Sequence, residues 1–142
     1  MTEPHSERAI QREAVPRAEA TLAYQMLPED ANSQGFVHGG SVTKLADTAA
    51  GVCAARHARC RVATVLIKEM TFNAPVKIGA LVTVHARLVG VGRTSMQIDV
   101  AVWAEEITSG ERVLTSTGRF VFVAIGEDGR ATPVPPMEPH DG

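Results

Sequence analysis

The hydrophobic residues of this chain repeat with two different periods, and the change between the periods limits the folds that the chain can adopt. From about Gly39 to about His57 the apolar residues recur at helical spacing, alanines are frequent and no proline interrupts the run. The helical stripe consists of Val42, Leu45, Ala46, Ala49 and Cys53. The pattern predicts one long apolar helix, which another layer of structure must cover.

Outside this helix the hydrophobic period is two, which is typical of β-strands. A weak strand is expected from Ala20 to Leu27, and Pro28 ends it. The strands expected after the helix lie in residues 62–71, 82–88, 96–102 and 113–125. No helix-length segment separates the last strands, so we expect them to pair antiparallel. The fold class is therefore predicted to be α+β, with a curved antiparallel sheet wrapped around a long central helix.

Glycines mark special positions in this strand region. Gly90, Gly92 and Gly110 lie in the gaps between apolar stretches, where we expect hairpin turns. Gly118 lies inside the last expected strand, where the missing side chain would let another segment approach closely.

The size of the chain fits one compact domain. It has 142 residues, of which 44% are hydrophobic. Residues 1–17 alternate charges with prolines and are expected to form a flexible arm, residues 18–126 form the domain, and the proline-rich residues 127–142 form an extended tail.

Charge and hydropathy exclude several classes of partner. The formal net charge is -2, without the basic excess of a nucleic-acid-binding protein. No apolar run is long enough to span a membrane, and the first residues lack the apolar segment of a secretory signal. We therefore expect a cytoplasmic protein with neither nucleic acid nor membrane as a partner.

The sequence carries no pattern of a metal or cofactor site. Cys53 and Cys60 lack the second pair of ligands of a zinc site, so we interpret them as free thiols. A nucleophilic cysteine with Arg56 or His57 as its basic neighbour is the alternative. The histidines have no metal spacing, and the chain lacks a Gly-x-Ser-x-Gly motif, a phosphate-binding loop and a dinucleotide fingerprint.

The strongest candidate site is the start of the predicted helix. Gly39 and Gly40 would present backbone N–H groups at the positive end of the helix dipole, where an oxygen that becomes negative during acyl transfer would be stabilised. The alternative is that both glycines serve only the shape of a turn.

Asp47 lies about two turns further along the predicted helix. Its neighbours on the same face are Ala50, Gly51 and Ala54, which are small enough for another segment to come close. A partly desolvated carboxylate at this position would have a raised pKa and act as a base. In the alternative interpretation Asp47 is exposed and pairs with Lys44 or Thr43.

Four further features are candidates for binding. Asn32 can orient a water molecule or a carbonyl group, or it can simply form a turn. His38 can bond a thioester or a phosphate, or it can be a structural loop residue. The segment from Gly92 to Ser95, with Arg93 and Thr94 between them, suits a phosphate or amide ligand, or it can be a plain turn. Arg56, near the end of the helix, can attract phosphates or interact with the helix dipole alone.

Taken together, these motifs resemble one family, the hotdog-fold acyl-CoA thioesterases, and most closely their bacterial and cytosolic acyl-CoA hydrolase branch. The resemblance extends from about residue 20 to about residue 135. The matching segments, in order, are Asn32-x-x-Gly35, Gly39-Gly40 with Asp47, Arg61–Val65, Met70–Val76 with Gly79, Val91–Met96 and Phe120–Ala124.

The resemblance implies a hotdog fold and hydrolysis of acyl-CoA to a free carboxylic acid and CoA. Asp47 would be the general base or the nucleophile, Asn32 of the facing protomer would place the water or the thioester, and the N–H near Gly40 would polarise the carbonyl. CoA is part of the substrate, and no other cofactor is implied.

The resemblance also implies which residues contact CoA and how the chain assembles. The segment Gly92–Ser95 would lie along the CoA pantetheine and phosphates, and we group Thr64 and Arg56 with it as CoA-binding candidates. Protomers would pair edge to edge into homodimers with active sites between them, and three dimers would form a hexamer.

Several alternatives stay open at this point. His38 occupies a position that is usually apolar in this branch, and a His-Gly-Gly run is more similar to aryl-CoA thioesterases of the same superfamily, so fatty and aryl acyl groups are both possible. A non-catalytic acyl-CoA-binding regulator is the main alternative function. A dehydratase that pairs Asp47 with His38 is a further alternative.

Overall fold

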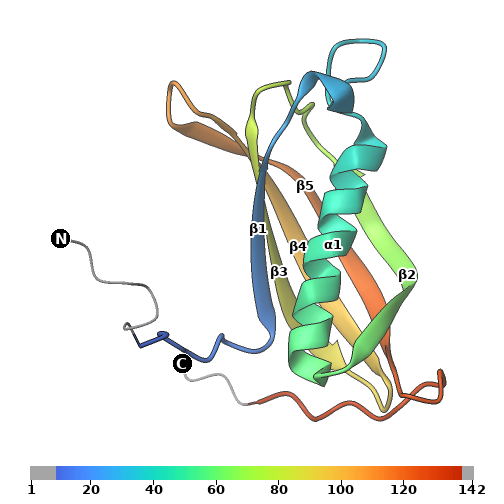
Figure 1. The fold of residues 1–142 in the computed structure, drawn as a ribbon. Helices are drawn as coiled ribbons and strands as arrows, with labels where there is room; N and C mark the ends of the chain where they lie inside the picture. Colours follow the sequence, from blue (N-terminus) through green and yellow to red (C-terminus); the bar gives the residue numbers. More distant parts are fainter. Residues whose placement is uncertain (1–8, 139–142) are drawn as a thin grey trace.

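Five antiparallel strands form one sheet, and one long helix lies across a single face of it (Figure 1). The computed structural model describes residues 9–138, so the outer parts of the predicted arm and tail, residues 1–8 and 139–142, lie outside the described residues. The elements are β1 (Glu19–Gln25), a 3-10 turn η2 (Pro28–Asp30), α1 (Gly39–Ala58), β2 (Arg61–Phe72), β3 (Leu81–Val91), β4 (Ser95–Glu106) and β5 (Glu111–Ile125). This confirms the predicted α+β class.

The order of the strands across the sheet is β1-β3-β4-β5-β2, and every neighbouring pair is antiparallel. β1 and β2 therefore form the two edges. Since β2 follows α1 after a short turn, the two run in opposite directions, and β2 lies beside the helix at the edge of the sheet (Figure 1).

The core lies between α1 and the inner face of the sheet. Alternate residues of β3 and β4, such as Val84 and Ile98, point inward and are fully buried. The helix contributes mainly small side chains, among them Ala46, Ala49 and Ala50, which are also fully buried. Because these side chains are small, the helix can lie close to the sheet, and large residues such as Phe120 fill the space from the sheet side.

The edge strand β2 is long, irregular and open. It pairs with β5 on one side, and its register shifts twice, between Thr64 and Leu66 and between Lys68 and Thr71. Met70, in the second irregularity, lies over Gly118 of β5, where an added Cβ would come within 2.7 Å of the Met70 Sδ. The close approach that the sequence predicted at Gly118 is therefore the contact with Met70 of β2.

The structure corrects one predicted turn. Gly92 and Gly110 lie in the turns between β3 and β4 and between β4 and β5, as expected, and Gly110 has a positive φ of 74°. Gly90 instead lies inside β3, opposite Gln97 and next to a register shift. A bulge, and not a turn, explains this glycine.

Within residues 9–138, no helix has the length and apolar character that would let it cross a membrane. Cys53 is buried, Cys60 is half-buried, and both are free thiols, as predicted.

Candidate active site

Asp47 is held by a threonine of the neighbouring edge strand. The carboxylate lies on α1 and is half-buried, and the hydroxyl of Thr64 donates a hydrogen bond of 2.6 Å to its Oδ1. Thr64 belongs to the inner side of β2, since its pairing partner Phe122 is part of the core. Within the described part of the chain Oδ2 has no hydrogen-bond partner, so one oxygen is fixed and the other is free to act on a ligand.

The alternative considered from the sequence, in which Asp47 pairs with Lys44 or Thr43, is not found in the structure. Thr43 donates its hydroxyl to the carbonyl of Gly39, and among the described residues Asp47 forms no ion pair with Lys44. The carboxylate therefore faces the sheet edge and is not held by its own helix.

The start of α1 offers free N–H groups. The N–H groups of Ser41 and Val42 both donate to the carbonyl of His38, whereas those of Gly39 and Gly40 make no hydrogen bond within residues 9–138. A Cβ at Gly40 would meet nothing within 4 Å, and one at Gly39 would lie 3.6 Å from the ring of Phe72. The helix start is thus open to a ligand at Gly40 and lies beside the end of β2 at Gly39.

Asn32 and His38 belong to the loop that leads into the helix. The Asn32 Oδ1 accepts hydrogen bonds from the backbone N–H groups of Gln34 (2.8 Å) and Phe36 (3.1 Å), so this oxygen stabilises a turn. Its amide nitrogen has no partner within residues 9–138 and can donate to a ligand. His38 is exposed, and its backbone N–H donates to the carbonyl of Asp30.

The predicted CoA-binding residues lie toward the C-terminal end of α1, with the exception of Thr64. The segment Gly92–Ser95 forms the turn between β3 and β4, close to the C-terminal end of the helix in Figure 1. Arg56 also lies there, and its guanidinium donates to the carbonyl of Glu19 at 2.9 Å. Thr64, which sequence reasoning grouped with these residues, lies instead against Asp47.

Sequence reasoning missed the contact between Thr64 and Asp47, although a signal for it existed. The alternation of β2 places Val62 and Thr64 on the same face, and Val62 packs against the core. A polar residue on that inward face needs a polar partner on the helix, and Asp47 is the only acidic residue of α1.

Cys53 does not have the properties of a nucleophile. It is fully buried among apolar residues, and this burial raises the pKa of its thiol from 9.0 to about 11, while the neighbouring Arg56 lowers it only in part. The described residues also contain no group of three or more His, Cys, Asp or Glu side chains that could hold a metal ion.

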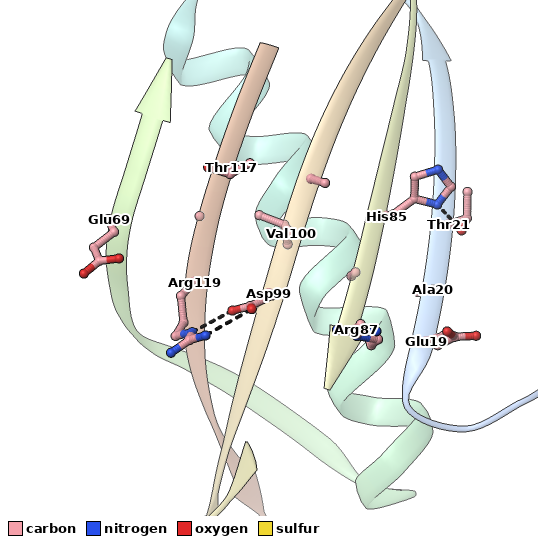
Figure 2. A pocket seen from close by; sticks show the side chains of 13 residues that line it. Glu19, Ala20, Thr21, Glu69, His85, Arg87, Asp99, Val100, Thr117 and Arg119 are labelled. Carbon is pink, nitrogen blue, oxygen red and sulfur yellow. Dashed lines mark hydrogen bonds and ion pairs between the residues drawn. The ribbon is translucent and has the colours of Figure 1, made fainter. Parts of the chain in front are cut away.

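The opposite face of the sheet carries a separate hollow of about 670 Å³, shown in Figure 2 with the helix behind the strands. A bidentate ion pair between Arg119 and Asp99 crosses it, with distances of 2.6 and 3.0 Å, and this pair raises the pKa of Arg119. None of the candidate residues lines this hollow. The candidate site therefore lies on the helix side of the sheet, at the edge formed by β2.

Comparison with known proteins finds similarity to thioesterases and acyl-CoA thioester hydrolases. The sequence profile described as the thioesterase superfamily matches residues 34–111. An acyl-CoA thioester hydrolase of Zymomonas mobilis, itself uncharacterised, is 43% identical over 86% of this chain and 82% of its own length. The acyl-CoA thioester hydrolase YciA of Salmonella typhimurium is 34% identical over 84% of this chain and 92% of its own length. The chain spans only 33% of the human cytosolic acyl coenzyme A thioester hydrolase, to which it is 32% identical.

Solved structures share the fold. A hexameric acyl-CoA thioesterase in its apo form superimposes with a TM-score of 0.84 at 33% identity, covering 92% of this chain and 84% of that chain. The aspartate-to-alanine mutant of a hexameric, broad-specificity acyl-coenzyme A thioesterase gives a TM-score of 0.78 at 32% identity, covering 80% of this chain and 84% of that chain. These similarities confirm the predicted hotdog arrangement of helix and sheet.

Proposed function

Because this chain belongs to the thioesterase superfamily, we propose that it hydrolyses acyl-CoA to a carboxylic acid and CoA, with Asp47 as the catalytic carboxylate. The observation that carries the proposal is the hydrogen bond from Thr64, which orients Asp47 and leaves its Oδ2 free. A carboxylate held in this way can accept a proton from water or attack a carbonyl carbon directly.

In the first route, Oδ2 of Asp47 removes a proton from a water molecule as the water oxygen attacks the thioester carbon. The carbonyl oxygen becomes negative, and the free N–H groups at Gly39 and Gly40 stabilise it, helped by the helix dipole. The carbon–sulfur bond then breaks, and the CoA sulfur leaves with the proton that Asp47 received. In the second route, Asp47 attacks the carbon itself, CoA leaves as a thiolate that takes a proton from solvent, and water hydrolyses the resulting anhydride.

The open edge of β2 supports a site shared between two copies of the chain. This edge has no partner strand among the described residues, and it exposes several large apolar side chains. They are Val65 (56% exposed), Leu66 (48%), Ile67 (43%) and Phe72 (52%). An unpaired edge of this kind tends to pair with another strand, and a second copy of β2 can bury it symmetrically.

The two contacts between β2 and α1 predict what such pairing would bring together. Thr64 lies against Asp47, and Phe72 lies against Gly39. A two-fold axis near Lys68, midway between them, would place Thr64 of one copy opposite Phe72 of the other. Asp47 of one protomer would then face the helix start of its partner, where Gly40 and Asn32 lie. Within one helix, Gly40 and Asp47 are seven positions apart, which corresponds to a rise of about 10 Å. In a site between two antiparallel helices, Asp47 of one protomer would meet Gly40 of the other without this separation.

The remaining candidates complete the proposal. We assign the free amide of Asn32 to the attacking water or the thioester carbonyl, His38 to the rim of the acyl site, and residues 92–95 with Arg56 to CoA. Both solved structures described above are hexamers, which supports three such dimers as the assembly.

Replacing Asp47 with asparagine tests the proposal. Asp47→Asn keeps an oxygen for Thr64 but removes the negative charge, so kcat for an acyl-CoA should fall at least about 100-fold with a small change in KM. Asp128→Asn, in the turn after β5, is the matched control and should keep normal activity. Near-normal turnover by Asp47→Asn would refute the role of Asp47, and acyl-CoA binding by the wild type without hydrolysis would favour the regulatory alternative.

Oxygen-18 found in Asp47 after a single turnover in labelled water would identify the second route. If Asp47 acts as a base, the label enters the released acid in the first turnover. If Asp47 forms an anhydride that water opens at the aspartyl carbon, the label enters Asp47 first, which mass spectrometry of the peptide detects.

A further inference from the structure

His57 is a buried polar residue that the proposed reaction does not use. It lies in the last turn of α1 with 2% of its surface exposed. Its Nε2 lies 2.8 Å from the carbonyl oxygen of Pro135, and since a carbonyl oxygen can only accept, Nε2 carries the proton and donates. The carbonyl of His57 in turn accepts a hydrogen bond from Arg17. A fully buried histidine therefore ties the end of the helix to the C-terminal segment.

The segment that His57 holds also makes backbone contacts with the turn between β3 and β4. After a tight turn at residues 126–130, the N–H of Thr132 donates to the carbonyl of Ala124, and the N–H of Val134 donates to the carbonyl of Arg93, both at 2.9 Å. Figure 1 shows this segment passing below the end of α1 and the β3–β4 turn. Val134, which contacts Arg93, and Pro135, which contacts His57, are adjacent in the sequence.

The 92–95 turn is fixed from a second side by β5. The N–H of Ala124 donates to the carbonyl of Thr94 at 3.0 Å, and the N–H of Gly92 donates to the carbonyl of Ser95 at 2.9 Å. The carbonyl groups of Arg93 and Thr94 are thus held by two different segments, while the side chain of Arg93 stays exposed. A turn held through its backbone presents its side chains in a defined direction, which lowers the entropic cost of binding.

We propose that His57 is a positioning residue for the CoA part of the substrate. It holds Pro135, the adjacent Val134 holds Arg93, and the 92–95 turn is thereby kept in the conformation that binds the phosphates. The proposal rests on the proposed function, because it requires that this turn contacts CoA. It assigns His57 a role in substrate affinity and none in the chemical step, since it lies about 15 Å along the helix from Asp47.

Kinetics with two thioesters of the same acyl group test this role. One substrate is the acyl-CoA, and the other is the N-acetylcysteamine thioester, which lacks the nucleotide and its phosphates. His57→Leu should raise KM for the acyl-CoA about tenfold, a loss of about 1.4 kcal/mol, with kcat within about twofold of the wild type. kcat/KM for the short thioester should not change, because that substrate does not reach the turn.

Two matched variants control for a general effect on the fold. His57→Gln places an amide N–H at the position of Nε2 and should restore the low KM. His85→Leu makes the same substitution on the opposite face of the sheet and should leave the kinetics with both substrates unchanged, since within residues 9–138 His85 bonds only Thr21. An equal loss of activity on both thioesters, or no change in KM for the acyl-CoA, would overturn the proposal.

Hydrogen exchange provides a readout that does not require activity. In His57→Leu the amides of Val134 and of residues 92–95 should exchange faster, while those at the centre of α1 keep the wild-type rate. If His57→Leu does not fold, Val134→Pro removes the N–H that holds Arg93, together with the partly buried valine side chain, and should raise KM in the same selective way. A wild type that hydrolyses neither thioester would refute the proposed function, whereas unchanged exchange at residues 92–95 would refute the positioning role itself.

Discussion

At the scale of single residues, the proposed site depends on how Asp47 is oriented. Its carboxylate receives one hydrogen bond, from a β-branched residue whose side-chain rotamers are restricted by the strand. The bond fixes Oδ1 and so directs Oδ2. Neither the helix nor β2 alone creates this arrangement, since Asp47 and Thr64 are 17 residues apart in the sequence.

Replacing Thr64 with valine should show what this orientation contributes. Thr64→Val keeps the shape of the side chain and removes the hydroxyl, so the carboxylate can rotate and kcat should fall about 5-fold to 30-fold, which corresponds to about 1–2 kcal/mol. Steady-state kinetics with one acyl-CoA measure the effect. Thr71→Val, on the same strand but bonded to Thr117, is the control, and an equal loss in both variants would argue against the orienting role.

The buried thiol of Cys53 predicts a loss of stability at high pH. Burial raises the pKa of Cys53 from 9.0 to about 11, so between these values the folded protein binds the proton that the unfolded chain has released. The free energy of unfolding should therefore be unaffected below pH 9 and decrease by up to about 3 kcal/mol as the pH rises to 11. Urea unfolding of the wild type and of Cys53→Ala measures the difference, and parallel pH profiles of the two proteins would contradict it.

At the scale of elements, the hydrophobic periods of the sequence predicted most of the helix and strands correctly. The helix predicted from Gly39 to His57 extends to Ala58, and the four later strands are each found within a few residues of the expected bounds. These elements were predictable because each has one buried face, which imposes its period on the sequence. Gly90 was wrongly assigned to a turn because a bulge and a turn leave the same local signal.

The candidate site was less predictable than the fold, for a physical reason. Asp47, Gly39 and Gly40 belong to one helix, so their relation follows from helical geometry alone. Thr64 joins them only because β2 crosses to the far edge of the sheet, beyond β5, and no local pattern encodes that strand order. The bond from His57 to Pro135 depends in the same way on the path of the C-terminal segment after β5.

At the scale of the whole molecule, the groups that we propose to react lie along one open edge of the sheet. Asp47 and the free N–H groups at Gly39 and Gly40 both lie next to β2, an edge that is exposed, apolar and unpaired in residues 9–138. Pairing of two β2 strands would bury these apolar side chains and build two identical sites at once. The same surface would thus supply both the free energy of assembly and the geometry of catalysis.

Mixing two inactive variants distinguishes a shared site from one contained within a protomer. Asp47→Asn removes the carboxylate, and Asn32→Asp keeps the oxygen that holds its turn but loses the amide donor. About half of the dimers formed on co-expression contain one copy of each variant. If each site combines Asp47 of one protomer with Asn32 of the other, every mixed dimer has one intact site out of two. About a quarter of the wild-type activity should therefore return. Purification through two different affinity tags isolates the mixed dimers, in which the recovered fraction should rise to about one half for the same reason. If both residues act within one protomer, the mixed dimers contain no intact site, and their activity should stay as low as that of either variant alone.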